Sequence, residues 1–493
     1  MLMTQPFLPA LLTDLYQFTM SYGYWKAGRA RHRACFHLFF RRAPFGGAYA
    51  LAAGLDSALD FLSALRFDSD VTDYLRSVTG SDGRPIFEDE YLRFLRTEPL
   101  DLEIDAVSEG TPVFSNEPLL RVVGPMWLAQ IVETPLLNIV NFQTLIATKA
   151  ARVRQAAGPG GKVLEFGLRR AQGQDGGLSA ARAAMIGGCD ATSNALAGKL
   201  LGVPVKGTHA HSWVMSFDSE EEAFETYVKT QPNNTILLVD TYDTLEGVRK
   251  ACAVGERLRE RGHELAGVRL DSGDLGALSK EARIILDAAG FPNAQIVASS
   301  DLDEYEIARL RADGAPIDVW GVGTRLATGG DQAALGGVYK LAAIDDGSGW
   351  RRCLKLSSTE IITTNPGIQQ VRRWRDGDGT MRADGIGDVT ESALAPVEYL
   401  VGQTNHRERF ALDPAWRAET LLEPVWRGNE PLARTSCVKA IAARARAQLA
   451  SLPEAHRRLD APEPYFTGLT PALAETKATM IANVRERATA RKG

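Results

Sequence analysis

The chain has 493 residues, of which 45% are hydrophobic and 24% are charged, and its formal net charge at pH 7 is −5. This length exceeds the ~250–300 residues at which a single core usually stops growing, and the composition is that of a soluble globular protein rather than of a disordered, collagen-like or coiled-coil chain. Because there is no basic excess to neutralise a phosphate backbone, we expect no nucleic-acid partner.

The cysteines and the N-terminal segment bear on the compartment. Five cysteines lie far apart without a CxxC pair, which is typical of reduced thiols rather than of a disulfide or a metal site. The first residues lack a basic start and are interrupted by Pro6, Pro9 and Asp14, so they do not resemble a secretory signal. No apolar run approaches the ~20 residues that cross a bilayer. We therefore expect a cytoplasmic protein with no membrane partner.

Short β-like runs and helical stretches mix through residues 34–123, which indicates an α+β domain. Thr134 and Pro135 then suit the N-cap and the first turn of a helix, and apolar residues at helical spacing follow as far as Gly158. The sequence predicts one long helix here, which joins two halves of the chain.

From Lys162 onward, short apolar runs recur, and each ends in polar or glycine residues before a helix-like segment. The runs are KVLEFGLRR, VPVKGTHAH, TILLVDTYDT, LAGVRLDSGD, QIVASSDLD and IDVWGVGT. Strands that alternate with helices indicate a parallel sheet covered on both faces. Polar clusters stand at every strand end, where an α/β barrel places its catalytic groups, so we favour a barrel over an open sheet.

Beyond about Ala343 this rhythm is lost. The last hundred or so residues contain Ala/Arg-rich patterns, CVKAIAARARAQLASL and LAETKATMIANVRERATARKG, which predict surface helices with solvated basic faces.

A glycine-rich segment, GVGTRLATGGDQAALGGVYK, follows the last of these strands at residues 321–340. Glycines let backbone amides approach an oxyanion closely, so Gly321, Gly323 and Thr324 form a candidate phosphate site. The segment is neither a P-loop nor a dinucleotide fingerprint, and it could also simply turn the chain. Ser299, in SSDLDE, offers a second possible phosphate contact near a helix N-terminus.

Two strand ends carry paired carboxylates. They are Asp240 with Asp243 in DTYD, and Asp271 with Asp274 in LDSGD. Magnesium is usually held by one or two carboxylates together with substrate phosphates, so we expect a metal–diphosphate substrate here, with Asp271 and Asp274 as catalytic carboxylates and no metal site made by the protein alone. The alternative is a helix N-cap role for Asp271 or Ser272.

EFGLRRAQG places Arg169 and Arg170 directly after a predicted strand. Paired arginines recognise carboxylates or phosphates through forked donors, although surface ion pairing is the commoner role of an isolated pair. We expect both to bind an anionic substrate.

KGTHAHSW contains two alternating histidines, His209 and His211, whose imidazoles would face the same side if the strand continues through them. A histidine in such a sheet is usually packed or hydrogen-bonded, but its ring nitrogen can also accept a phosphoryl group. Their position beside Thr208, at a strand end near carboxylates and a glycine-rich segment, makes a phosphate-handling site the favoured interpretation.

Together these segments resemble the nicotinate phosphoribosyltransferase family. The similarity covers roughly residues 10–370 in the family's order. Its motifs are LLTDLYQFTM, FFRRAPFGGAYALAAGL, EGTPVFSNEPLLRVVGP, EFGLRRAQGQDGG, GVPVKGTHAHS, VDTYDT, GVRLDSGDL, GVGT, KLSS and NPG. The resemblance implies the α/β fold of a type II phosphoribosyltransferase, an irregular TIM-like barrel with an N-terminal α+β sandwich-like domain, to which this chain adds a helical C-terminal extension. The expected parts are an N-terminal domain at 1–130, a barrel with the active site at 131–345, and a region at 346–493 that partly completes the first domain.

The resemblance also implies a reaction. Such an enzyme, of the ligase class, converts nicotinate, phosphoribosyl diphosphate and ATP to nicotinate mononucleotide, pyrophosphate, ADP and phosphate in NAD salvage, with Mg²⁺ held through the substrate diphosphate. Tyr16, Thr208 and Arg269 would contact nicotinate, Thr324 would contact phosphoribosyl diphosphate, and His211 would become a phosphohistidine. Family members usually form homodimers whose active sites draw on both subunits.

Three positions depart from the family pattern. His209 stands where an apolar residue is expected, and Ile362 stands where many relatives carry a lysine. The single Cys437 leaves no paired-cysteine knuckle, so we expect no zinc.

Two alternative functions stay open, a nicotinamide phosphoribosyltransferase and a catalytically silent regulatory homologue. The arginines of the strand ends favour a carboxylate substrate over an amide. The presence of His211, Asp271, Asp274 and Thr324 together argues against a silent copy.

Overall fold

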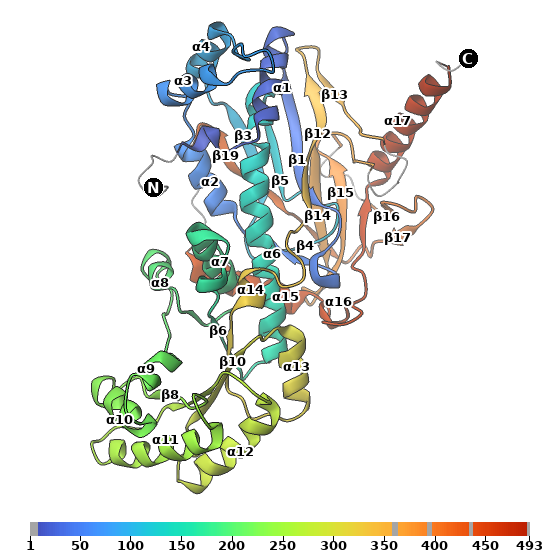
Figure 1. Ribbon diagram of the computed structural model, residues 1–493. Helices are drawn as coiled ribbons and strands as arrows, with labels where there is room; N and C mark the ends of the chain where they lie inside the picture. The colour runs from blue at the N-terminus through green and yellow to red at the C-terminus, as the bar shows by residue number, and fades with distance from the viewer. Residues whose placement is uncertain (1–7, 357–362, 392–396, 433–436, 491–493) are drawn as a thin grey trace. The chain divides into compact units, whose positions relative to one another are not determined.

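The computed structural model describes residues 8–356, 363–391, 397–432 and 437–490, so Ile362 lies outside the described part. The chain divides into two compact units. The first unit comprises Met1–Thr144, Leu335–Ser436 and Ala447–Gly493, and the second comprises Leu145–Ala334 with Cys437–Arg446. Both units mix helices with strands (Figure 1), which confirms the expected α/β class.

A seven-stranded antiparallel sheet forms the core of the first unit. Its β1 (Arg33–Phe40) pairs with β5 (Leu120–Pro125) on one side and β12 (Gly337–Asp345) on the other. The remaining strands are β3 (Leu102–Val107), β13 (Trp350–Arg352), β19 (Leu422–Gly428) and β20 (Glu430–Pro431). Every residue of β1 after the first is buried, which explains its nearly continuous apolar run.

Short helices accompany this sheet. They are α1 (Leu15–Lys26), α2 (Leu55–Ala64), α3 (Ser69–Ser77), α4 (Asp89–Thr97), α5 (Met126–Ile131), η2 (Pro9–Leu11) and η3 (Pro44–Gly46), with the two-residue strands β2 (Ala50–Leu51) and β4 (Pro112–Val113). The local sequence explains their bounds, since Asp68 caps α3 by accepting from the Val71 N–H at 3.1 Å. In α4 the buried Tyr91, Leu92 and Leu95 share one face, as an amphipathic helix requires.

A second sheet in the first unit corrects the expectation of a helical C-terminal extension. Its strands are β14 (Gln369–Arg375), β15 (Met381–Asp388), β16 (Tyr399–Gly402), β17 (Arg409–Ala411), β18 (Arg417–Thr420) and β21 (Thr467–Leu469). The two expected helices are present, as α15 (Val438–Ser451) and α17 (Pro471–Ala490), with the short α16 (Glu454–Arg457) between them. The strands escaped the sequence pattern because their interior positions include charges, such as the fully buried Arg373 and Asp384.

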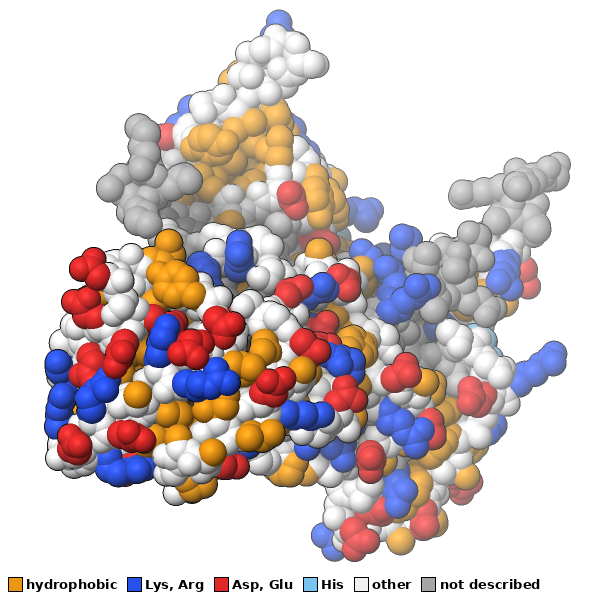
Figure 2. All heavy atoms as spheres, turned by 60° about the horizontal axis from the view of Figure 1, so that its bottom comes forward, with side chains coloured by type: hydrophobic (Ala, Val, Ile, Leu, Met, Phe, Trp, Pro, Cys, Tyr) orange, Lys and Arg blue, Asp and Glu red, His pale blue; other side chains and the backbone are white. Residues whose placement is uncertain are grey.

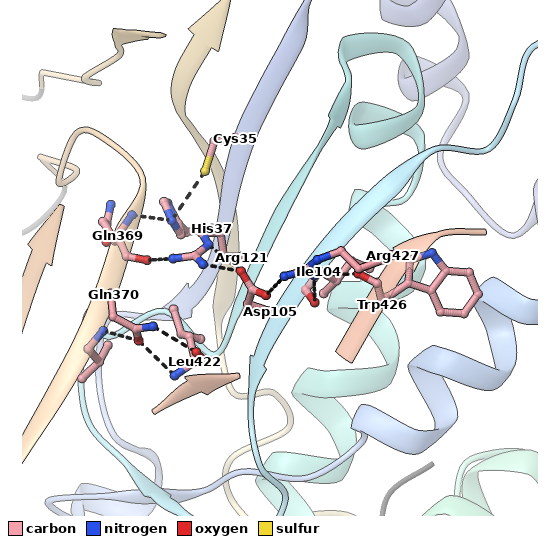
Figure 3. A network of polar contacts seen from close by, with 11 residues as sticks. Cys35, His37, Ile104, Asp105, Arg121, Gln369, Gln370, Leu422, Trp426 and Arg427 are labelled. Carbon is pink, nitrogen blue, oxygen red and sulfur yellow. Dashed lines mark hydrogen bonds and ion pairs between the residues drawn. The ribbon is translucent and has the colours of Figure 1, made fainter. Parts of the chain in front are cut away.

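A buried polar network ties the early strands of the first unit to its late ones (Figure 3). Asp105 on β3 accepts from Arg121 on β5 at 3.0 Å and from Arg427 on β19 at 2.6 Å. Arg121 also donates to the Gln369 carbonyl at 2.6 Å, and the Gln369 N–H donates to His37 Nε2 at 3.2 Å. Arg121 and Gln369 are 248 residues apart in the sequence. Charge-assisted hydrogen bonds therefore join distant segments of the first unit.

The long helix α6 (Glu133–Ala157) leads from the first unit into the second, close to the expected bounds. The second unit contains six parallel strands in the order β7-β6-β11-β10-β9-β8. Their bounds are β6 (Lys162–Glu165), β7 (Ala191–Thr192), β8 (Ile236–Leu238), β9 (Gly267–Leu270), β10 (Gln295–Ser300) and β11 (Val319–Val322). This confirms the parallel sheet read from the recurring apolar runs.

The first strand of this sheet, β6, pairs with the last, β11, as strands of a barrel do. In the described residues, however, β7 and β8 share no ladder, and only one parallel bridge, between Thr192 and Val205, lies on this side. The run VPVKGTHAH was expected to be a full strand and contributes just this bridge, so the ring of hydrogen bonds stays open at one seam.

Helices follow most of these strands. They are η4 (Leu168–Arg170), α7 (Gly173–Gly187), α8 (Ala195–Leu201), α9 (His211–Met215), α10 (Glu220–Thr230), α11 (Thr244–Arg259), α12 (Leu275–Ala288), α13 (Glu304–Ala312) and α14 (Thr324–Ala327). Basic and acidic side chains are interspersed on the face shown in Figure 2. Arg257 of α11 contacts Glu221 of α10 at 2.7 Å, and Arg261, just beyond the end of α11, contacts Glu225 of α10 at 3.7 Å. Among the described helices, none has the length and apolarity needed to span a membrane.

Candidate functional site

The carboxyl ends of the parallel strands surround a cavity of about 330 Å³ in the second unit. Its lining residues are Phe166, Arg169, Arg170, Arg269, Asp271, Ser299, Ser300, Asp301, Gly321, Gly323 and Thr324. Most of the residues expected to bind substrate therefore meet in one place, although they come from separate strand ends. They meet because the strands are parallel and adjacent, so their polar ends share one edge of the sheet.

Arg269, near the end of β9, is the most connected side chain of the cavity. Its Nε donates to Ser299 Oγ at 2.7 Å, its Nη1 to Thr208 Oγ1 at 3.2 Å, and its Nη2 to Asp271 Oδ1 at 3.0 Å. A guanidinium carries five N–H groups. Two of them, one on each terminal nitrogen, are left for a ligand, which is the number that a forked contact with a carboxylate uses.

Asp271 faces both Arg269 and His211. Its Oδ1 accepts from Arg269 and from the Ser299 hydroxyl, and its Oδ2 lies 3.8 Å from His211 Nε2. Burial alone would raise the pKa of this carboxyl, but the Ser299 hydroxyl, Arg269 and His211 outweigh it and hold the pKa below its ordinary value. Asp271 is therefore an ionised group with one oxygen fully engaged and the other turned toward a histidine.

His211 is the first residue of α9, and its side chain is 41% exposed. Its Nδ1 lies 3.1 Å from Thr241 Oγ1, a contact within hydrogen-bond distance. The imidazole is thus bracketed by a hydroxyl on one nitrogen and by Asp271 on the other, and it remains accessible to a ligand.

His209 has a different environment, and the prediction that both imidazoles face the same side of one strand is wrong. Its ring is buried against Tyr227, with ring centroids 4.7 Å apart, and its Nε2 accepts the Leu238 N–H at 3.2 Å. Burial, together with the nearby Arg269 and His211, lowers the pKa of His209 to about 4, so it is neutral at pH 7. Its position opposite β8 makes it a packing residue, and the two histidines separate because a helix begins at His211.

The four aspartates of the two motifs do not share one role. Asp240 accepts the Asp271 N–H at 2.9 Å and the Ser272 hydroxyl at 2.6 Å through Oδ2, so it holds the loop that carries Asp271. Its buried Oδ1 has no hydrogen-bond donor among the described residues. Asp243 caps α11 by accepting the Glu246 N–H at 2.8 Å.

Asp274, expected to be catalytic, caps α12 by accepting the N–H groups of Gly276 and Ala277 at 3.0 and 3.1 Å. The N-cap alternative therefore holds for this loop, but at Asp274 rather than at Asp271 or Ser272. Asp274 is exposed and does not line the cavity, which separates it from Asp271.

Arg169 and Arg170 project from the one-turn helix η4 and are exposed at the cavity. In the part of the chain that the structure describes, neither has an ion-pair partner. The turn itself is held by the buried Glu165, which accepts the Gly167 N–H and the Thr192 hydroxyl, both at 2.5 Å. Arg169 and Arg170, on a turn that Glu165 holds in place, are therefore suited to bind an anionic ligand.

Glycines of the strand ends are needed for close packing. A Cβ on Gly167 would lie 2.3 Å from Ala327 Cβ, and one on Gly321 would lie 2.7 Å from the Phe166 ring. Gly323 precedes α14, whose first residue, Thr324, lines the cavity. These contacts set the aromatic ring and the glycine-rich segment against one another.

Two expected substrate contacts lie outside the lining. Thr208 is joined to the site by its hydrogen bond with Arg269, and Tyr16 is an exposed residue of α1 in the first unit. Phe166, Ser300 and Asp301 also line the cavity and Thr241 is the partner of His211, although the sequence predicted none of these roles. Each stands inside or beside a motif already singled out, and that adjacency was the available signal.

Comparisons with known proteins show which family the chain is similar to. Two family models match, the nicotinate phosphoribosyltransferase N-terminal domain over residues 11–141 and the nicotinate phosphoribosyltransferase C-terminal domain over residues 368–477. The nicotinate phosphoribosyltransferase of Bacillus subtilis is 47% identical over 366 residues, which cover 74% of this chain and 73% of that protein. The human nicotinate phosphoribosyltransferase is 38% identical over 525 residues, which cover 94% of this chain and 95% of that protein.

Two solved structures are similar to this chain in fold. A crystal structure of human nicotinic acid phosphoribosyltransferase has a TM-score of 0.82 at 36% identity and covers 95% of this chain and 100% of its own. The nicotinate-nucleotide pyrophosphorylase of Pyrococcus furiosus has a TM-score of 0.66 at 20% identity, covers 90% of this chain and 95% of its own, and supports the fold alone.

Proposed function

The chain belongs to the nicotinate phosphoribosyltransferase family, and from this premise we propose that it joins nicotinate to the ribose 5-phosphate of phosphoribosyl diphosphate in an ATP-coupled step of NAD salvage. The observation that carries the proposal is Arg269, which lines the cavity together with Arg169 and Arg170 and has two N–H donors that no described residue uses. Nicotinate brings a carboxylate and phosphoribosyl diphosphate brings phosphates, so both substrates are anions that such a cavity favours.

In the transfer, the pyridine nitrogen forms a bond to the anomeric carbon of the ribose. The bond from that carbon to the pyrophosphate oxygen breaks, and pyrophosphate leaves with the electron pair. Charge builds on the sugar as it does in glycoside chemistry, so positioning and electrostatic stabilisation matter more than proton transfer. Arg269 and Thr208 would orient nicotinate, while Arg169, Arg170 and Thr324 would hold the phosphates.

ATP reacts with His211, which we assign as the phosphoryl acceptor. One ring nitrogen forms a bond to the γ-phosphorus, the bond to the bridging oxygen breaks, and ADP leaves with that oxygen. Later hydrolysis of the phosphohistidine releases phosphate. The exposure of His211 supports this assignment, whereas the buried, hydrogen-bonded ring of His209 has no access to ATP.

We expect Mg²⁺ to be held at this site by the substrate diphosphate and only one or two carboxylates. Among the described residues no cluster of three or more His, Cys, Asp or Glu side chains could hold a metal ion. Two carboxylate oxygens at the strand ends are candidates: Asp271 Oδ2, and Asp240 Oδ1, which is buried without a hydrogen-bond donor among the described residues. One or two carboxylates are what Mg²⁺ takes when it arrives on a diphosphate, where it neutralises the charge of the leaving group.

We also propose that the enzyme acts as a cytoplasmic homodimer in which α1 of each copy helps to complete the partner's site. Leu12, Leu15, Tyr16 and Met20 form an exposed apolar stripe on and before α1, and Leu196 and Leu200 form another on α8. Exposed stripes of this kind mark interfaces, and a two-fold axis would pair them twice. Free cysteines in the described residues fit a reducing compartment.

Purified protein tests the function when pyrophosphate release is followed with nicotinate, with nicotinamide and with neither. Release that requires nicotinate supports the proposal, preference for nicotinamide supports the nearest alternative, and no release with either indicates a silent homologue. The dimer is tested by mixing inactive Tyr16→Ala and Arg269→Ala proteins. Shared sites predict that activity returns on mixing, because one site per mixed dimer is then intact.

A further inference from the structure

A pocket of about 430 Å³ in the first unit shares no residue with the strand-end cavity of the second unit. Its walls come from the linker between α2 and α3, the last turn of α4, the segment that follows α4, and the turn between β19 and β20. The lining residues are Arg66, Phe67, Asp68, Leu95, Arg96, Glu98, Pro99, Leu100 and Asn429. Pockets that hold small molecules usually measure about 300–1,000 Å³, so this one has room for an organic ligand.

The two arginines of this pocket have donors to spare. Among the described residues, the guanidinium of Arg96 has no hydrogen bond or ion pair, and that of Arg66 donates only to the neighbouring Leu65 carbonyl. Both residues are exposed, so their charges are accessible from solvent. Guanidiniums bind carboxylates and phosphates through forked pairs of N–H donors, and two of them in one pocket suit an anionic group.

The two carboxylates of the pocket, in contrast, already have partners. Asp68 caps α3 by accepting the Val71 N–H at 3.1 Å. Glu98 pairs with Arg31, whose Nε lies 3.1 Å from Glu98 Oε2. With Arg31 included, three arginines stand against two carboxylates, which leaves a positive excess. The pocket therefore favours an anion over a cation.

An apolar wall favours a ligand that also carries a ring. Phe67 and Leu95 are 7% and 1% exposed, and Pro99 and Leu100 continue the same lining. Phe67 packs edge-on against Trp127 of α5, which has no exposed surface, with ring centroids 5.6 Å apart. The position of the Phe67 ring is thus fixed by the core of the unit. A fixed aromatic ring in a pocket with two guanidiniums suits an anion with a flat apolar body.

We propose that this pocket binds a small aromatic carboxylate or phosphate, with Arg66 and Arg96 on the anionic group and Phe67 and Leu95 on the ring. The proposal is independent of the function proposed above, because no residue assigned to its substrates takes part. A bound ligand would join the linker between α2 and α3 to the end of α4, and it would stabilise the folded chain by mass action.

Saturation-transfer NMR on the full-length protein tests this with phenyl phosphate and benzoate as probes. Benzyl alcohol, a ring of the same size without charge, is the comparison. Because the strand-end cavity also attracts anions, the titrations are made in wild-type protein and in protein that carries Arg169→Gln, Arg170→Gln and Arg269→Ala. In both proteins we expect at least one of the two anions to bind at least ~10-fold more tightly than benzyl alcohol, the effect of one charge-assisted hydrogen bond.

The substitution Arg66→Gln/Arg96→Gln, made in both proteins, removes the cations of the pocket. In the protein whose strand-end cavity has lost its arginines, it should weaken the tighter anion by at least ~10-fold. The matched control is Arg93→Gln, also on α4, whose guanidinium pairs with Glu90 at 2.8 Å and does not line the pocket. This control should leave binding unchanged. Circular dichroism and size-exclusion chromatography should show the same fold and oligomeric state for all variants, because the substituted side chains are exposed.

Three outcomes would overturn the proposal. They are equal binding of the anions and benzyl alcohol, undiminished binding in Arg66→Gln/Arg96→Gln, and an equal loss in Arg93→Gln. A change of oligomeric state in Arg66→Gln/Arg96→Gln would also overturn it, since the arginines would then belong to a contact between copies of the chain. None of these results bears on the strand-end cavity, so the proposed function would stand.

Discussion

Each unit of the molecule contains an arginine–aspartate pair, and the two pairs differ in what surrounds them. In the first unit, Arg373 and Asp384 have no exposed surface, and Asp384 also accepts the Tyr465 hydroxyl at 3.1 Å. In the second unit, the side chains of Arg269 and Asp271 are 12% and 28% exposed, and Arg269 keeps two N–H donors for a ligand. The same two residue types thus hold a core in one unit and border a cavity in the other.

The difference teaches that the chemistry of an ion pair depends on which of its atoms remain available. Arg373 donates to both oxygens of Asp384 and to the Pro112 carbonyl at 2.8 Å, and its guanidinium lies 5.4 Å from the Phe114 ring. Water and ligands have no access to it. The pair in the second unit is less completely satisfied, since among the described residues Asp271 Oδ2 accepts no hydrogen bond and two N–H groups of Arg269 are not used.

The largest effect should follow from breaking the buried pair. Arg373→Ala leaves Asp384 as an uncompensated buried charge, which costs about 3–5 kcal/mol of folding stability. Urea unfolding followed by circular dichroism would show this as a large fall in the unfolding midpoint. If the variant unfolds at the wild-type midpoint, the pair in the first unit is not structural and the comparison fails.

The matched change in the second unit, Arg269→Ala, should act on catalysis instead. We expect kcat/KM for nicotinate to fall about 100-fold to 1,000-fold, equivalent to about 3–4 kcal/mol, because a buried forked contact to the carboxylate is lost. Its unfolding midpoint should change much less than that of Arg373→Ala. A large stability loss with little change in kcat/KM would reverse the roles of the two pairs.

His209 gives a prediction about pH. Its pKa is lowered from an ordinary 6.5 to about 4 in the folded chain, mainly by burial. Between these values the unfolded chain binds more protons than the folded one, so stability falls as the pH drops from about 6.5 toward 4, by up to about 3 kcal/mol. His209→Gln, which cannot titrate, should flatten this part of the stability curve. Unfolding free energies measured at several pH values in that window would check it, and an unchanged slope would contradict the burial of this ring.

The smallest effect concerns the helix caps that share motifs with the site. Asp243→Ala removes the acceptor of the Glu246 N–H and should cost about 1 kcal/mol of stability, the usual value for an N-cap. Because Asp243 is not among the described residues that line the cavity, KM values for the substrates should stay near those of the wild type. Steady-state kinetics beside thermal unfolding would detect a catalytic role if one exists.

Much of the second unit could be predicted from the sequence because its signals are local. Continuous apolar runs indicated the parallel strands, and Thr134 with Pro135 indicated the start of α6 to within two residues. The strand-end motifs predicted the cavity because parallel strands necessarily bring their ends together.

The rest depends on contacts that no local pattern contains. Strands β14 and β15 bury Arg373 and Asp384, and a charge at an interior position breaks the apolar alternation by which strands are recognised. The separate roles of His209 and His211 depend on the Leu238 N–H of a distant strand, 29 residues away from His209. Likewise, the motif LDSGD does not tell which of its aspartates caps the helix and which faces the histidine.

One measurement tests the central claim most directly: the rate of pyrophosphate release from phosphoribosyl diphosphate with nicotinate, compared with that for nicotinamide, in wild-type and Arg269→Ala protein. The account predicts release that depends on nicotinate, a strong preference for nicotinate over nicotinamide in the wild type, and loss of most of that preference in the variant. Equal rates for the two pyridines in the wild type, or a preference that survives in Arg269→Ala, would contradict it.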